Sequence, residues 1–200
     1  MKYLTLIFIA AFFSCKDFKK EIPKGKDGQN VYSYKWMKIL TEKSKIKNLE
    51  EGIDSMCIRL WFSGSFRDTV KVIELKNENH IWTHNRYDLI VHYKDFWKDQ
   101  LDVKLVSKTQ TKPKSEWSTI IDSLFKLGIT KLPNDLAITH YTIPNHGNDV
   151  MIEAATKDYY RLYNLPIVQF GENKTIEEAQ KGIGIIRLIE SEFDFKSYII

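Results

Sequence analysis

Cysteine is scarce in this 200-residue sequence, which contains only Cys15 and Cys57. If Cys15 is chemically modified, Cys57 has no partner and no disulfide forms within the chain. Cys57 stands in an apolar run between Met56 and Ile58, a setting typical of a thiol that behaves as a small hydrophobic residue. A reactive nucleophile would need a neighbouring base and an electropositive environment. We therefore expect Cys57 to be buried and inert.

The signatures of several enzyme classes are also missing from the sequence. No serine or cysteine lies in a nucleophile elbow, and no glycine-rich loop is placed to hold a phosphate. There is no internal repeat and no low-complexity tract. The formal net charge of +4 is too small to indicate a nucleic-acid partner. We assign no catalytic residue, no metal site, no cofactor and no nucleic-acid partner, which favours a protein that is not an enzyme.

Long hydrophobic runs are absent except at the beginning of the chain. After the positively charged Lys2, residues 3–13 are all apolar or small, and a charged segment follows Cys15. A transmembrane helix needs about 20 apolar residues, so this run is too short to remain as a membrane anchor. A positive start, a short hydrophobic region and a small residue at its end are the features of a secretory signal.

The end of this run, Phe12-Phe13-Ser14-Cys15, resembles the lipobox of bacterial lipoproteins. The resemblance implies that residues 1–14 are a signal peptide that is removed, and that Cys15 carries a diacylglycerol on its sulfur and an acyl chain on its new amine. Two or three chains hold a protein stably on a membrane. In this family an aspartate after the cysteine often retains the protein at the inner membrane, so Lys16 favours the outer membrane, facing the periplasm or the outside. The alternative is an ordinary secretory signal followed by a free Cys15.

Lysine dominates the segment that follows. It also contains Pro23, Gly25 and Gly28 and few apolar residues. We expect residues 15–30 to form a flexible basic tether and residues 31–200 to form a single domain with its own core. The lysines serve either as part of a soluble spacer or as contacts to anionic lipid headgroups.

Hydrophobic periodicity predicts the secondary structure of this domain. The predicted strands are residues 55–63, 68–75, 81–83, 87–93, 101–108, 150–155 and 159–163, and the predicted helices are residues 31–51, 116–127 and 175–193. The short spacings between strands favour an antiparallel meander followed by a hairpin. We therefore predict an α+β fold in which about three helices pack on one face of a single antiparallel sheet.

Two histidines have the spacing of a zinc-binding pair on a helix. His80 and His84 lie in a β-like stretch, however, and the glutamate of that motif is missing. Positions four apart on a strand are separated by about 13 Å, so the two imidazoles cannot bind one metal ion. We expect both to be solvated histidines of a strand or turn.

Residues 134–148 have no periodicity and are the predicted functional loop. They contain His140 and His146, and Asp149 follows them. Unstructured connections longer than about 12 residues are uncommon and often functional. If these side chains converge on one pocket, they could serve a small hydrolase or a metal-dependent enzyme. The alternative is a long surface loop with scattered polar groups.

Aromatic and basic side chains alternate near the second predicted hairpin. Tyr159, Arg161 and Tyr163 share one face of a predicted strand. If that face is exposed, the patch suits a protein or carbohydrate partner in the envelope. If it is covered, the three side chains pack the sheet against a helix.

Several segments resemble a set of small uncharacterised lipoproteins of Bacteroidetes-type bacteria. The matching segments are Arg59-Leu60-Trp61, Pro113-Lys114-Ser115-Glu116-Trp117, Leu132-Pro133, Val150-Met151-Ile152-Glu153-Ala154-Ala155-Thr156 and Tyr160-Arg161-Leu162-Tyr163. The resemblance implies the compartment and supplies no activity and no catalytic residue. We therefore expect a lipid-anchored envelope lipoprotein that is a non-enzymatic binding or structural module. The alternatives are the loop-based enzyme and an inhibitor or immunity-type lipoprotein that blocks its target with an exposed sheet face.

Overall fold

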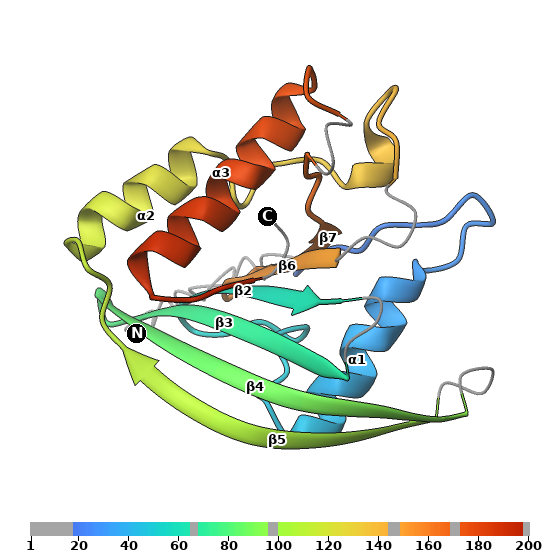
Figure 1. Ribbon diagram of the computed structural model, residues 1–200, viewed down its shortest axis with the longest axis horizontal. Coiled ribbons are helices and arrows are strands. Elements are labelled where there is room, and N and C mark those ends of the chain that lie inside the picture. Colours follow the sequence, from blue (N-terminus) through green and yellow to red (C-terminus); the bar gives the residue numbers. More distant parts are fainter. Residues whose placement is uncertain (1–17, 65–67, 96–99, 144–148, 169–172, 198–200) are drawn as a thin grey trace, which may run out of the picture.

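The α+β class expected from the sequence is found in the computed structural model of the chain (Figure 1). The structure describes residues 18–64, 68–95, 100–143, 149–168 and 173–197. Within these ranges, seven strands form one sheet in the order β1-β7-β6-β2-β3-β4-β5, and three α-helices pack against it. β2 to β5 form the predicted meander, and β6 and β7 form the predicted hairpin.

The boundaries of most elements lie close to those predicted, but the first helix, predicted over residues 31–51, ends at Ser44. The strands are β1 (Lys19–Glu21), β2 (Met56–Ser63), β3 (Thr69–Glu78), β4 (Ile81–Asp95), β5 (Gln100–Thr111), β6 (Asp149–Ala155) and β7 (Tyr159–Asn164). The helices are α1 (Tyr32–Ser44), α2 (Trp117–Lys126) and α3 (Glu177–Glu192), with a short 3-10 helix, η2 (Asp135–Ala137), before β6. The predicted segments 81–83 and 87–93 are parts of one strand, β4. No helix in the part of the chain that the structure describes is long and apolar enough to cross a lipid bilayer.

The sheet is mixed, so the prediction of a purely antiparallel sheet was wrong. β1 pairs in parallel with β7, with Lys19 opposite Tyr159. The prediction of a flexible tether over residues 15–30 was therefore also wrong from β1 onward, and the ordered domain begins before residue 31. Side chains hold the added strand in place, because Glu21 accepts a hydrogen bond from the Tyr159 hydroxyl and Lys20 pairs with Glu50. A strand of three residues is too short to produce a periodic pattern in the sequence.

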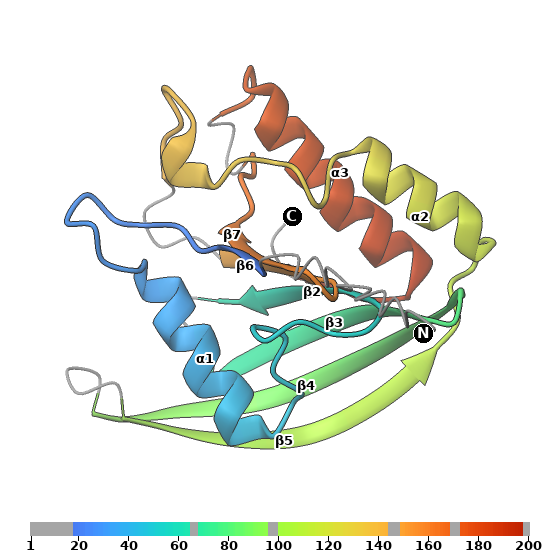
Figure 2. The same ribbon diagram turned by 180° about the vertical axis from the view of Figure 1, so that it is seen from behind.

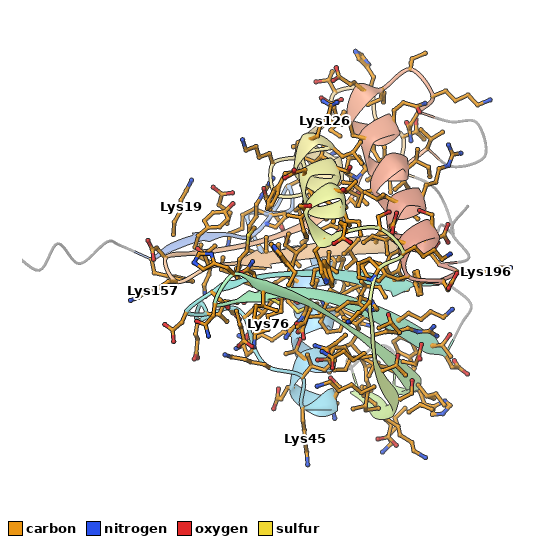
Figure 3. The ribbon with its side chains drawn as sticks, turned by 90° about the vertical axis from the view of Figure 1, so that its left-hand side faces the viewer. Lys19, Lys45, Lys76, Lys126, Lys157 and Lys196 are labelled. Atoms are coloured by element: carbon orange, nitrogen blue, oxygen red, sulfur yellow. The ribbon has the colours of Figure 1, made fainter. Side chains whose placement is uncertain are left out.

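Helices cover both faces of the sheet, whereas the sequence predicted helices on one face. α1 lies on one face, and α2 and α3 lie together on the other (Figures 1 and 2). Figure 3 shows the sheet edge-on between these two layers. The central strand β2 explains the difference, because it is buried on both sides. Its Ile58 and Leu60 belong to the core under α2 and α3, and its Cys57 and Trp61 belong to the core under α1.

Close backbone packing fixes α3 against the segment that follows β7. A Cβ atom added to Gly182 would lie 1.8 Å from the backbone oxygen of Pro166, much closer than two non-bonded atoms can approach. A Cβ atom on Gly184 would lie 3.2 Å from a flexible side-chain carbon of Leu127. Gly182 therefore allows the helix to approach its neighbour, and Gly184 does so much less.

Candidate functional site

The most concentrated group of charges lies buried between α1 and the sheet. Arg59 of β2 donates from Nε to Glu74 Oε2 of β3 at 2.7 Å, and its Nη2 lies 2.7 Å from the same oxygen. Its Nη1 donates to the Lys47 carbonyl oxygen at 2.6 Å and lies 3.8 Å from Glu153 Oε2 of β6. All three charged residues are buried. We call Arg59, Glu74 and Glu153 the buried charge cluster.

The carboxylates of the buried charge cluster are saturated with hydrogen bonds. Glu153 accepts from Trp61 Nε1 at 2.7 Å and from the Tyr160 hydroxyl at 3.0 Å. Glu74 also accepts from Asn85 Nδ2 and the Tyr87 hydroxyl, both at 3.0 Å. Satisfied and sealed polar networks of this kind specify the packing of a core. We therefore interpret the buried charge cluster as structural.

The two carboxyl groups of the cluster differ in the direction of their pKa shifts. Burial alone would raise the pKa of Glu74, but the charge of Arg59 and several hydrogen bonds outweigh it and hold that pKa below its ordinary value. Burial raises the pKa of Glu153, and the more distant charge of Arg59 only partly opposes it. The arrangement is thus an Arg59–Glu74 ion pair beside a second glutamate whose pKa is shifted in the opposite direction.

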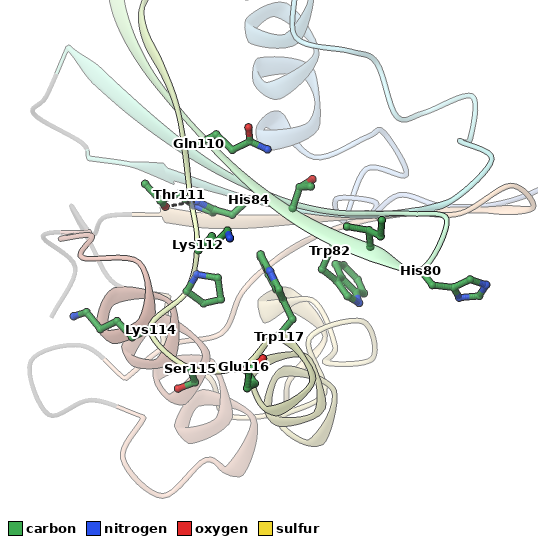
Figure 4. A pocket seen from close by; sticks show the side chains of 13 residues that line it. His80, Trp82, His84, Gln110, Thr111, Lys112, Lys114, Ser115, Glu116 and Trp117 are labelled. Atoms are coloured by element: carbon green, nitrogen blue, oxygen red, sulfur yellow. Dashed lines mark hydrogen bonds between the residues drawn. The ribbon is translucent and has the colours of Figure 1, made fainter.

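The open site lies at the end of the sheet where β4 begins, β5 ends and α2 starts. A cleft of about 860 Å³ is formed there by residues 80–84 and 110–117 (Figure 4). Trp82 of β4 and Trp117 of α2 both line it, and both are only partly buried. The Trp117 ring is supported from behind by Phe193, at 5.9 Å between ring centroids. We call this site the Trp cleft.

Polar side chains surround the aromatic wall of the Trp cleft. Gln110, Lys112 and Glu116 line it and are exposed. Lys114 instead pairs with Asp194 at 2.5 Å. The site thus combines apolar ring faces with a few donors and acceptors at the rim, which is the usual composition of a small-molecule site.

His84 forms part of the cleft lining and is 1% exposed. Its Nδ1 lies 2.8 Å from the Thr111 hydroxyl, and its ring stacks on Phe193 with centroids 4.1 Å apart. Its Nε2 has no hydrogen-bond partner among the residues that the structure describes. Burial and the charge of Arg86 together lower the pKa of His84 to about 4, although the charge of Glu74 opposes them. The imidazole is therefore neutral at neutral pH, and its Nε2 is both unpaired and buried beneath the floor of the cleft.

These positions correct the interpretation of the two strand histidines. His84 is buried, so the prediction that it is solvated was wrong, whereas His80 is exposed in the β3–β4 turn with a φ of 65°. The described ranges contain no group of three or more His, Cys, Asp or Glu side chains placed to hold a metal ion. The Trp cleft was missed because its two halves are distant in sequence and meet through the pairing of His84 with Thr111.

The structure gives only partial information on the predicted functional loop. His140 is exposed with a φ of 64°, Asp149 is exposed at the start of β6, and His146 lies outside the described residues. The loop is not structureless, because Asp135 accepts a hydrogen bond from the Leu136 amide within η2. Tyr141 is also fixed, since its hydroxyl accepts from the Ile167 amide at 3.1 Å.

The predicted patch of Tyr159, Arg161 and Tyr163 is mostly covered. Tyr163 is 1% exposed, and the Arg161 guanidinium stacks on its ring at 4.6 Å. Arg161 donates to the carbonyl oxygens of Thr130 and Leu132 at 2.7 and 2.5 Å. These side chains therefore join the sheet to the segment after α2 and do not form an exposed binding surface.

Of the two cysteines, the structure describes only Cys57. Cys57 is 1% exposed and unpaired, and burial raises the pKa of its thiol, so the prediction of a buried thiol is confirmed. Cys15 lies outside the described residues.

Comparison with models of protein families, with curated proteins and with solved structures finds no match to this chain. The Trp cleft, and neither the predicted loop nor the predicted patch, is the candidate functional site.

Proposed function

We propose that this chain is a lipid-anchored lipoprotein of the bacterial outer membrane that binds a ligand in the Trp cleft without transforming it. The anchor half of the proposal is supported by the short hydrophobic run that ends at Cys15, and by Lys16 directly after it. The binding half is carried by one observation. Trp82 of β4 and Trp117 of α2, both only partly buried, line one open cleft that has polar side chains at its rim.

A carbohydrate is the ligand class that best suits this chemistry. The apolar face of a sugar ring can lie against a half-exposed indole, while its hydroxyl groups need donors and acceptors around the ring. Trp82 and Trp117 offer the indole faces, and Gln110 and Glu116 offer the polar partners.

The lining of the Trp cleft supports binding more than catalysis. Among its described side chains, Glu116 is the carboxylate and it is exposed. Lys114 is paired with Asp194, and Ser115 is hydrogen-bonded to Glu192 at 2.8 Å. A hydrolase needs an acid and a base aligned on one substrate bond, and this lining supplies a single carboxylate.

The anchor is tested by metabolic labelling with a fatty-acid analogue, followed by membrane fractionation. We expect label on the wild-type chain in the outer-membrane fraction, and we expect Cys15→Ala to lose both the label and the membrane association. A Cys57→Ala control should keep both, since that thiol is buried. An unlabelled wild-type chain in the cytosol, with residues 1–14 still attached, would refute the anchor.

Binding is tested on an array of bacterial cell-surface oligosaccharides. We expect Trp82→Ala and Trp117→Ala each to weaken binding about tenfold or more, which corresponds to about 1.4 kcal/mol of stacking. Tyr32→Ala is the control, because this aromatic side chain is also exposed but lies at the start of α1. Equal loss in all three variants, or oligosaccharide binding that neither tryptophan affects, would contradict the proposal.

A second function is favoured by one observation near the predicted loop. Burial raises the pKa of Asp135 to about 6, and the charge of Asp149 adds to this effect. A carboxyl group that titrates near neutrality can act as a general acid, which fits the small hydrolase considered from the sequence. Hydrolysis of chromogenic glycosides or esters that Asp135→Asn abolishes would support it, and no hydrolysis by the wild type would exclude it for those substrates.

A further inference from the structure

The Trp cleft and the proposed lipid anchor lie at the same end of the sheet. Strand register shows this, because one row of paired residues crosses six strands. The row is Lys20, Tyr160, Ala155, Cys57, Lys76 and Thr83, on β1, β7, β6, β2, β3 and β4 in turn. Five strand spacings of about 4.8 Å place Thr83 about 24 Å from Lys20 along this row. On β4, Trp82 and Ile81 lie further toward this end of the sheet than the row does. Lys19 of β1 and Phe18 before it lie toward the same end.

The covalent chain keeps the anchor close to this end. Cys15 precedes Phe18, the first described residue, by three positions. An extended residue spans at most about 3.6 Å, so Cys15 is within about 11 Å of Phe18. If Cys15 is acylated, as the proposed function holds, no long tether separates the sheet from the membrane.

Apolar side chains are exposed at both sides of this end. Ile81, the first residue of β4, is 67% exposed, which is the highest value among the large hydrophobic residues of the described chain. Phe18, before β1, is 37% exposed and lies beside Gly52. Isolated exposed hydrophobic residues are common on soluble surfaces. These two flank one end of the sheet, close to the proposed anchor, where they can contact the apolar boundary of a bilayer.

The charges at this end are mixed in sign. Figure 3 looks onto it and labels Lys19, Lys76 and Lys157. Lys19 pairs with Glu21 at 2.6 Å, and Lys76 pairs with Glu78. Charge does not provide the attraction here, so contact with a membrane should change little with salt.

We infer that the end of the sheet formed by Phe18, the β6–β7 turn and the β3–β4 turn rests on the outer-membrane bilayer, with Ile81 in the headgroup region. This inference depends on the proposed anchor at Cys15. The Trp cleft includes residues 80–84, so it opens beside the bilayer. Its occupant is then a sugar displayed at the membrane surface, and a free oligosaccharide in the periplasm is a poorer fit.

The inference is tested with a polarity-sensitive fluorophore, NBD, on the full acylated chain in phosphatidylcholine–phosphatidylglycerol vesicles. One variant carries the dye at Ile81→Cys. The matched control carries it at Asp102→Cys, which is exposed near the start of β5, at the opposite end of the sheet. Cys57 is buried and does not react. We expect the dye at position 81 to shift its emission to shorter wavelength and to be quenched by spin-labelled lipid, and the dye at position 102 to remain water-like.

Flotation of the same vesicles separates the two proposals. If the chain floats with the vesicles while both dyes remain water-like, the anchor stands and the membrane-resting end is refuted. If position 102 is quenched and position 81 is not, the chain rests on its other end and the inference is again refuted. If the chain does not float, the anchor itself fails and the inference fails with it. Position-81 quenching that persists in 0.5 M salt supports the apolar contact.

Discussion

The two faces of the sheet hold their buried polar groups in opposite ways. Under α1, the buried charge cluster places one cation and two carboxyl groups inside the core, and hydrogen bonds satisfy the carboxyl groups. Under α2 and α3, the core is apolar up to the Trp cleft. There the single imidazole of His84 has one nitrogen paired and one nitrogen unpaired.

This difference shows which kind of polar group indicates a binding site. A dense but sealed and satisfied network stabilises a unique packing and offers nothing to a ligand. A half-satisfied group beneath the floor of an opening leaves one hydrogen bond unmade, and a ligand completes it only if the side chains above it move. The more conspicuous cluster on the α1 face is therefore structural, and the less conspicuous histidine on the other face marks the site.

The largest expected effect comes from removing the cation of the buried charge cluster. Arg59→Met leaves Glu74 and Glu153 buried without a counterion, so we expect the free energy of unfolding to fall by about 3–5 kcal/mol. The control is Arg86→Met on the other face, where a half-buried guanidinium pairs with Asp88 and should contribute less than about 1 kcal/mol. Urea unfolding of both variants measures this, and equal losses would remove the distinction between the faces.

The second effect is a pH dependence that originates at His84. Its pKa falls from 6.5 to about 4 on folding, so below pH 6.5 the unfolded chain takes up a proton that the folded chain does not. Stability should therefore fall as the pH drops from 6.5 to 4, by up to about 3 kcal/mol from this residue. Urea unfolding at pH 7.5 and 4.5 should show a smaller drop for His84→Gln than for the wild type. His80→Gln, in an exposed turn, should keep the full drop, and a full drop in His84→Gln would contradict the assignment.

The third prediction concerns the close packing of α3 at its two glycines, on the face of the sheet covered by α2 and α3. Gly182→Ala forces a carbon atom into the Pro166 backbone, and we expect a loss of about 2–3 kcal/mol as α3 shifts outward. Gly184→Ala meets only a flexible leucine side chain and gains helix propensity, so its stability should change by less than about 1 kcal/mol. Thermal unfolding of the pair is the measurement. Two variants of equal stability would mean that α3 packs differently from the structure.

The smallest effect separates the two carboxyl groups of the cluster. The pKa of Glu74 is lowered and that of Glu153 is raised, so removing the negative charge should cost less stability at Glu153 than at Glu74. We expect Glu74→Gln to lower the free energy of unfolding by about 1–2 kcal/mol, and Glu153→Gln to change it by less than about 1 kcal/mol. Chemical denaturation at pH 7.5 tests this, and the reverse order would refute the proposed difference between the two carboxyl groups.

Sequence periodicity predicted most elements of this fold but not their environment. Alternation located β2 correctly. Apolar residues at both sets of positions also indicated that both faces are buried, but the prediction of helices on one face did not use this signal. The signal for the buried charge cluster was present in the sequence, since Arg59, Glu74 and Glu153 each interrupt an apolar run. β1 was missed because three residues carry no period.

The candidate site was harder to predict than the fold. The Trp cleft joins residues 80–84 to residues 110–117 through strand register, which a linear sequence does not reveal. The histidine spacing drew attention to His84, but whether that side chain is solvated depends on Phe193, which directly follows α3 and lies 109 positions later, and which covers its ring. The resemblance of residues 12–15 to a lipobox, by contrast, is a local pattern that can be noticed without any fold, and it stays a prediction.

The most direct test of this account compares tryptophan indole signals in a ¹H–¹⁵N spectrum. The oligosaccharide that binds best on the array is added to the labelled chain. We expect the Nε1 signals of Trp82 and Trp117 to shift. The Nε1 signal of Trp61 should stay in place, because this buried indole donates to Glu153 Oε2 at 2.7 Å. A bound oligosaccharide that shifts Trp61, or that leaves Trp82 and Trp117 unchanged, would contradict the assignment of the Trp cleft as the binding site.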